Sequence, residues 1–274
     1  MAIRQKLSQL THWWNIVKEL SPRQVEQELL TPFRIALVGQ PDRTEAVWRV
    51  LTEGASPTML QTASEYVKRF TSPPNEEFDF VLACDVLEVP QDAVEAVVDH
   101  FHKHEFPLVA LARVLPGTRT LVVNRIIEDV ATLNAGLAML SAVPSVFPLL
   151  GLLAPPAALA DMVVLTKNQL MMVLRVAAAF GKAPDWKQRL PELSSVLGAA
   201  FGWRAVARQL VGLVPGGVGM VVKGMVAYAG TLTVGRAVAW FYATGQAPGK
   251  AERARLYQQA WEEAREKSKE WRQP

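Results

Sequence analysis

Residues 130 to 160 contain no charged side chain, and this uncharged stretch restricts the possible folds more than any other feature of the sequence. A straight membrane-spanning helix needs about 20 apolar residues, so the stretch is long enough for one. Its second half carries Pro144, Pro148, Pro155 and Pro156. Because proline lacks a backbone N–H and clashes with the preceding turn, we expect a helix, a break and a second helix.

Apolar helices are predicted on the C-terminal side of this stretch. The segment 160–181 predicts a long apolar helix that ends at Gly181, and 191–245 predicts glycine-punctuated apolar helices. Mean hydropathy is +0.12, which is high for a wholly soluble protein. The tail 250–271 is densely charged and predicts a solvated helix.

The segment from 33 to about 125 alternates predicted strands with predicted helices. The segment 64–70 is ambiguous, whereas the others are strands at 33–39, 78–86 and 106–114 and helices at 43–54 and 91–105. Strands separated by helices indicate a parallel sheet with crossover helices. We therefore expect an α/β N-terminal domain followed by an all-α apolar helical domain. The predicted regions are an amphipathic N-terminal region 1–30, the α/β domain 31–125, the helical domain 126–248 and a charged C-terminal helix 249–274.

Apolar residues recur at helical spacing from 3 to 20, which predicts an amphipathic helix. Two interpretations stay open. The helix packs on its own domain, or it lies on a membrane surface with Trp13 and Trp14 at the headgroup level. The segment has no continuous apolar core and no small-residue cleavage site, so we do not expect a signal peptide and expect the N-terminal half in the cytoplasm.

The segment 34–46, RIALVGQPDRTEA, begins like the phosphate-binding loop of a nucleotide hydrolase: an apolar strand runs into Gly39. That loop needs a lysine for the β- and γ-phosphates and a hydroxyl for magnesium. Here Thr44 is followed by Glu45 at the lysine position and Ala46 at the hydroxyl position, and Asp42 adds a second negative charge. We therefore predict a degenerate, P-loop GTPase-like unit without a bound cofactor.

A guanine-specificity element, Asn-Lys-x-Asp, should follow the predicted strand 106–114, but the sequence there is RVLPG. VVLTKNQ at 163–169 is an incomplete substitute, because Gln169 stands where an aspartate would bind the guanine edge. The flanking sequence also has a helical pattern.

No metal site is expected. His100, His102 and His104 lie close in sequence, but helical spacing places only His100 and His104 on one face, and zinc needs three or four ligands. Cys84 is the one cysteine, so a disulfide framework is excluded. The net charge of +3 and the pI near 9.0 are too small an excess to indicate nucleic acid, and no basic tract interleaves with aromatic residues.

Asp161, Asn168 and Arg175 recur every seventh residue along the apolar helix and form one polar stripe. Polar groups in so apolar a helix must face partners or water. Arg204 and Arg208 are the expected partners of Asp161. Structural pairing between helices and a functional polar pathway both stay open.

The C-terminal half resembles a known family. The phrases LTKNQ (165–169), WRAVARQLVGLVPG (203–216) and AYAGTLTVGRA (227–237) are similar to the YcjF-like, GTPase-associated helical domain, a bacterial domain of unknown function. The resemblance covers roughly residues 120 to 245. It implies that LTKNQ is helical, that a GTPase domain precedes the module, and that relatives associate with membranes; it supplies no catalytic residues. The N-terminal half then resembles a GTPase domain that has lost its motifs.

The sequence leads to three hypotheses. The first is a non-enzymatic, membrane-associated interaction or scaffold protein with a pseudo-GTPase domain, held at the cytoplasmic face of the cell membrane by shallow or hairpin insertion. In this hypothesis an unidentified protein is the partner, and a homo-oligomer is compatible with it. The second is a residual nucleotide binder or slow GTPase. The third is a soluble helical regulator in the cytoplasm, whose apolar helices form its own core.

Overall fold

The structure is a computed structural model that describes residues 22–140, 157–185, 187–189, 193 and 219–271. The chain divides into two compact units. Arg23–Ile126 and Arg175–Ala183 form the first, which we call the α/β unit. The remaining described residues from Ile127 onward form the helical unit. The expected helix at 3–20 and the expected break after residue 140 lie outside the described residues, apart from the last four residues of the uncharged stretch.

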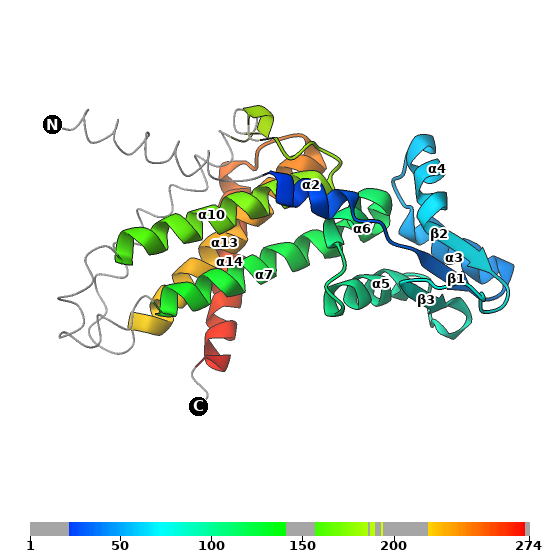
Figure 1. Ribbon diagram of the computed structural model, residues 1–274. Helices are drawn as coiled ribbons and strands as arrows, with labels where there is room; N and C mark the ends of the chain where they lie inside the picture. The colour runs from blue at the N-terminus through cyan, green and yellow to red at the C-terminus, as the bar shows by residue number, and fades with distance from the viewer. Residues whose placement is uncertain (1–21, 141–156, 186, 190–192, 194–218, 272–274) are drawn as a thin grey trace. The chain divides into compact units, whose positions relative to one another are not determined.

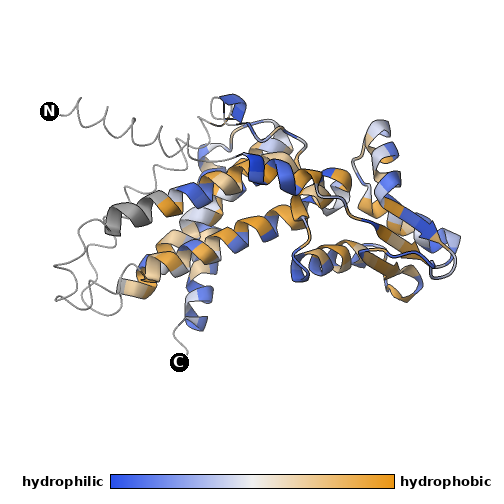
Figure 2. Ribbon diagram, in the orientation of Figure 1, coloured by the Kyte–Doolittle hydropathy of each residue, from blue (hydrophilic) through white to orange (hydrophobic). Residues whose placement is uncertain are grey.

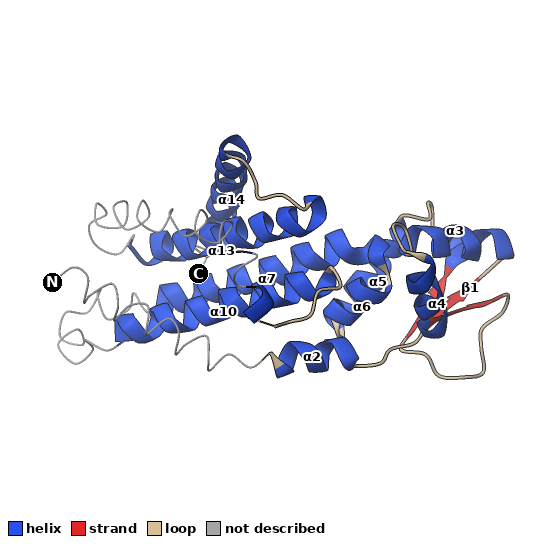
Figure 3. Ribbon diagram, turned by 90° about the horizontal axis from the view of Figure 1, so that it is seen from above, coloured by secondary structure: helices blue, strands red, loops and turns tan. Residues whose placement is uncertain are grey.

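The α/β unit contains a three-stranded parallel sheet (Figure 3, red). Its strands are β1 (Ile35–Val38), β2 (Val67–Phe70) and β3 (Phe80–Ala83), in the order β2-β1-β3. Ile35 lies opposite Val67 in one neighbour and opposite Phe80 in the other. The chain thus adds β2 on one side of β1 and then crosses to add β3 on the other. The expected parallel sheet is confirmed.

Helices bury the central strand. Ile35, Ala36 and Leu37 of β1 have no exposed surface, as expected for a parallel strand that is covered on both faces. Helix α3 (Pro41–Leu51) packs on β1 and β2, and α5 (Asp92–Lys103) packs on β3 and on α3. The ambiguous segment 64–70 resolves into the end of α4 (Pro57–Tyr66) and all of β2.

The expected strand at 106–114 is wrong, because this segment forms the helix α6 (Leu108–Val114). Five of its seven residues are buried, so the run is apolar in every direction and shows no periodicity that separates helix from strand. Helix α2 (Arg23–Leu30) packs against α6 in the same unit (Figure 1). Two single 3₁₀ turns, η1 (Cys84–Val86) and η2 (Pro116–Thr118), complete the α/β unit.

The helical unit is built from long helices: α7 (Arg119–Leu140), α10 (Ala157–Ala179), α13 (Gly219–Thr244) and α14 (Lys250–Glu270). The first residues of α7 and the last of α10 belong to the α/β unit. Helix α10 ends two residues before Gly181, as the sequence predicts. Its continuous helical path includes 165–169, so LTKNQ is not a loop.

Apolar side chains of these helices are buried within the protein. Met172 and Leu174 of α10 and Val234 and Val238 of α13 have no exposed surface. A Cβ added at Gly235 would lie 2.7 Å from the side chain of Ile127, so α13 approaches α7 too closely for a larger residue. Among the described residues, no helix combines the length and the hydropathy that a membrane crossing needs.

Helix α14 differs from the solvated helix that its charge suggests. Figure 2 shows it as largely hydrophilic beside the apolar α13. It nevertheless packs along α13 and buries one residue in every four, namely Leu256, Ala260, Ala264 and Ser268. The carboxylate of Glu263 accepts two hydrogen bonds from Arg236, at 2.8 and 2.7 Å. Small buried residues let the charged helix lie close to its neighbour while its long side chains reach water.

Candidate functional site

The turn between β1 and α3 is the candidate site, since phosphate-binding loops lie at this place in nucleotide hydrolases. Strand β1 ends at Val38 and α3 begins at Pro41, so Gly39 and Gln40 form the whole connection. A phosphate loop needs a longer run of residues whose N–H groups surround the phosphates. Pro41 is the first helical residue and has no N–H to contribute. The turn is therefore too short to form a phosphate cradle.

A carboxylate of the protein lies at this turn. Asp85 follows β3, and its Oδ1 accepts a 2.9 Å hydrogen bond from the backbone N–H of Gln40. Gly39 has φ +152°, and a Cβ there would lie 2.6 Å from the same oxygen, so only glycine fits. Because the strand order reverses at β1, the carboxyl ends of β1 and β3 form the switch point where ligands bind in open α/β sheets. Asp85 fills that point with a negative charge.

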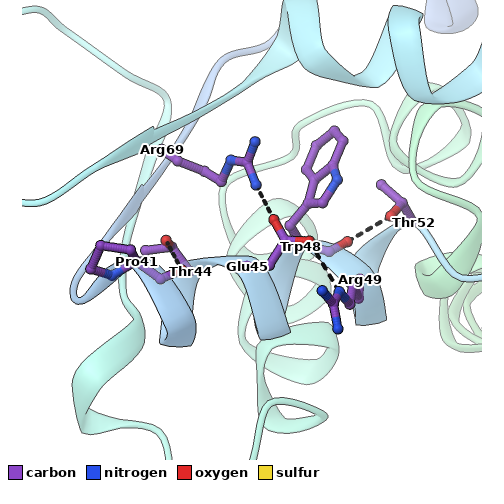
Figure 4. Close-up of polar contacts among 7 residues, drawn as sticks. All are labelled: Pro41, Thr44, Glu45, Trp48, Arg49, Thr52 and Arg69. Carbon is purple, nitrogen blue, oxygen red and sulfur yellow. Dashed lines mark hydrogen bonds and ion pairs between the residues drawn. The ribbon is translucent and has the colours of Figure 1, made fainter.

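Glu45 is held by two arginines (Figure 4). Its Oε1 accepts a 3.0 Å hydrogen bond from Nε of Arg49, one turn further along α3, and its Oε2 pairs with Arg69 of β2. The Arg69 guanidinium also lies over the ring of Trp48, 5.5 Å from its centre. Glu45 thus ties α3 to the sheet, and a structural role accounts for a residue that occupies the lysine position of a phosphate loop.

The remaining residues of the predicted loop offer no ligand to a nucleotide. The hydroxyl of Thr44 is buried and donates to the carbonyl of Pro41, 3.1 Å away (Figure 4). Asp42 is exposed in the first turn of α3, and Ala46 is half-buried and has no polar group. A phosphate here would face the carboxylates of Asp42 and Asp85. At about 4 Å, one such like-charge contact costs about 4 kcal/mol at an effective dielectric constant of 20.

Cys84, next to Asp85, is not a nucleophile. Its side chain is fully buried and its thiol donates to the carbonyl oxygen of Leu82 at 3.7 Å. Burial, and then the neighbouring Asp85 carboxylate, raise the pKa of the thiol to about 11. Since the thiolate is the reactive form, this cysteine is unreactive at neutral pH.

The histidines of α5 lie among aromatic rings. The ring of His100 stacks on Phe80 at 4.3 Å and lies 4.4 Å from the ring of His104. Its Nε2 is 3.0 Å from the carbonyl oxygen of Asp79, so it joins α5 to the start of β3. In the described part of the chain, no three His, Cys, Asp or Glu side chains gather as metal ligands would.

The polar stripe of α10 divides between two partners. Asn168 donates to Oδ1 of Asn134 at 2.9 Å. Arg175 forms a two-pronged ion pair with Glu28 of α2, with its closest contact at 2.6 Å. The side chain of Asp161 lies outside the described residues, as do Arg204 and Arg208, so their pairing stays a prediction.

Sequence reasoning missed a buried polar cluster, which consists of Asn134, Asn168, Gln169 and Thr231. The Thr231 hydroxyl accepts hydrogen bonds from Asn134 at 3.1 Å and from Gln169 at 3.0 Å, and it donates to the carbonyl of Ala227 at 2.8 Å. All of its hydrogen-bonding capacity is used. Asn134, a polar residue inside the uncharged stretch, was the available signal, but only ionisable residues were weighed. The cluster fixes how α7, α10 and α13 pack.

No protein-family model, curated protein or solved structure matches the chain. The resemblance to the YcjF-like helical domain therefore stays a prediction.

Proposed function

We propose that this chain is a non-catalytic interaction protein in which a GTPase-like α/β unit has lost nucleotide binding and a YcjF-like apolar helical unit accompanies it. The observation that carries the proposal is the contact of Asp85 with the turn at Gly39 and Gln40. A nucleotide hydrolase keeps this position for phosphate, whereas here a carboxylate of the chain lies there.

Three further features agree with this role. The turn has no lysine and no available hydroxyl, and Pro41 removes one backbone donor. Glu45 stabilises the packing of α3 on the sheet instead of binding a ligand. Cys84 is buried and protonated at neutral pH, because its pKa is about 11. The α/β unit thus keeps the architecture of a nucleotide domain and offers surfaces instead of chemistry.

The nucleotide content of freshly purified protein tests this proposal against the residual nucleotide binder. Acid extraction followed by ion-exchange chromatography should recover only trace guanine or adenine nucleotide. A GTPase with an intact phosphate loop, purified in parallel, should release close to one equivalent. Recovery of about one equivalent from this chain would overturn the proposal.

The proposal includes association with the cytoplasmic face of the cell membrane. It is supported by the uncharged stretch 130–160 and by the amphipathic pattern at 3–20. The burial of apolar residues in α10 and α13 supports the alternative, a helical core without lipid. Fractionation of cells separates the two: a membrane pellet that resists carbonate supports association, whereas a monodisperse species in the detergent-free supernatant supports the helical core.

A further inference from the structure

Strand β3 lies at one edge of the sheet, and its outer side is open. The backbone N–H of Phe80 donates to the carbonyl of Arg34, next to β1. Successive residues of a strand point their backbone groups to opposite sides, so the N–H and C=O groups of Val81 and Ala83 point away from β1. Within the residues that the structure describes, no further strand pairs there. These groups form a template for one more strand.

The open edge is apolar. Val81, Val86 and Val89 are 48%, 79% and 49% exposed, and we call them the valine patch. The chain that carries them is held in place, because Arg43 donates to the carbonyl of Leu87 and the N–H of Val89 donates to Asp92 at 3.1 Å. Exposed apolar side chains beside an unpaired strand are a liability that a permanently exposed edge normally avoids.

The same region is acidic in a protein with a net charge of +3. From residue 70 to residue 102 the sequence contains no lysine or arginine and eight acidic residues, which are Glu76, Glu77, Asp79, Asp85, Glu88, Asp92, Glu95 and Asp99. Asp79 and Asp85 flank β3 at its two ends, and Glu88 is exposed between two residues of the valine patch. The charge at this edge therefore favours a basic partner.

We propose that the outer edge of β3 binds an extended segment of a partner protein, with alternating apolar and basic residues, as a fourth strand. Main-chain hydrogen bonds to Val81 and Ala83 supply affinity, the valine patch receives the apolar side chains, and the flanking carboxylates select lysine or arginine. A second copy of this chain fits less well. An antiparallel β3 pair centred on Leu82 would place Asp79 opposite Asp85, and like charges facing each other across strands are destabilising. The inference deepens the proposed interaction role by naming the chemistry of the partner.

The test uses the full chain and a capped synthetic peptide of five Val-Lys repeats as the probe. A second peptide carries N-methyl groups on four consecutive central residues, which removes backbone donors but keeps every charge and side chain. On the protein, Val81→Pro removes only the outward-pointing N–H of β3, because the ladder to β1 uses Phe80 and Leu82. Val81→Thr keeps that N–H and is the matched control. Circular dichroism and thermal melts verify that each variant is folded.

The peptide should bind the wild type, and N-methylation and Val81→Pro should each weaken it by about tenfold, as loss of one or two hydrogen bonds predicts. Val81→Thr should stay within about threefold of wild type, and Glu88→Lys should weaken binding and reduce its salt dependence. Absence of binding, or equal binding of both peptides, would refute the inference. Self-association of the wild type that Val81→Pro abolishes would also refute it, because the occupant is then a second copy. Nucleotide recovery from the same preparations tests the interaction role separately.

Discussion

Replacing Thr231 by valine is expected to destabilise the helical unit by about 2–4 kcal/mol. The side chain has no exposed surface, and valine has nearly the same shape, so no large cavity forms. What changes is the hydroxyl, which accepts from Nδ2 of Asn134 and Nε2 of Gln169. Each buried donor that loses its acceptor costs about 1–3 kcal/mol, and the benefit of burying a methyl group in place of a hydroxyl offsets part of the sum.

Thr233 supplies the control for this substitution. It is also a buried threonine of α13, and its hydroxyl donates to the carbonyl of Ala229, four residues earlier, at 2.7 Å. The structure shows no side chain that donates to it, so Thr233→Val should change the free energy of unfolding by less than about 0.5 kcal/mol. Urea unfolding followed by circular dichroism measures both variants. If they differ by less than about 0.5 kcal/mol, the polar cluster does not hold the helices together.

Three further predictions concern single residues. Cys84 should not react with a thiol reagent at pH 8 until the protein is unfolded, because its pKa is raised to about 11; rapid stoichiometric labelling of the folded protein would contradict this. Burial, followed by the carboxylates of Glu128 and Glu263, raises the pKa of Tyr228 to about 12. The associated stability is present below about pH 10 and lost as the pH rises through 12, so thermal melts should fall in that window less steeply for Tyr228→Phe. Gly39→Ala should cost about 1–3 kcal/mol, because its Cβ would lie 2.6 Å from Asp85; an unchanged melting temperature would show that the turn is not constrained.

Patterns within one segment were predictable, whereas contacts between distant segments were not. Strand β1 and helices α3, α5 and α10 follow from periodicity and from punctuation such as Gly54 and Gly181. The segment that forms α6 was misassigned because a fully buried run has no polar face.

The candidate site shows the same limit. The residues that exclude a phosphate lysine and hydroxyl were legible at 45 and 46, but the role of Asp85 was not. It depends on β3 pairing beside β1, 45 residues away along the chain. The partner of Arg175 was likewise hidden, since Glu28 lies 147 residues earlier. Burial of α14 depended on small residues spaced four apart, a weak signal in a charged sequence.

Calorimetric titration with GTP and with ATP in the presence of Mg²⁺ tests the central claim most directly. The α/β unit has a carboxylate at its switch point and neither a lysine nor an available hydroxyl in the turn. We therefore predict that neither nucleotide binds more tightly than about millimolar, which corresponds to about −4 kcal/mol. Micromolar binding that depends on magnesium would contradict the account.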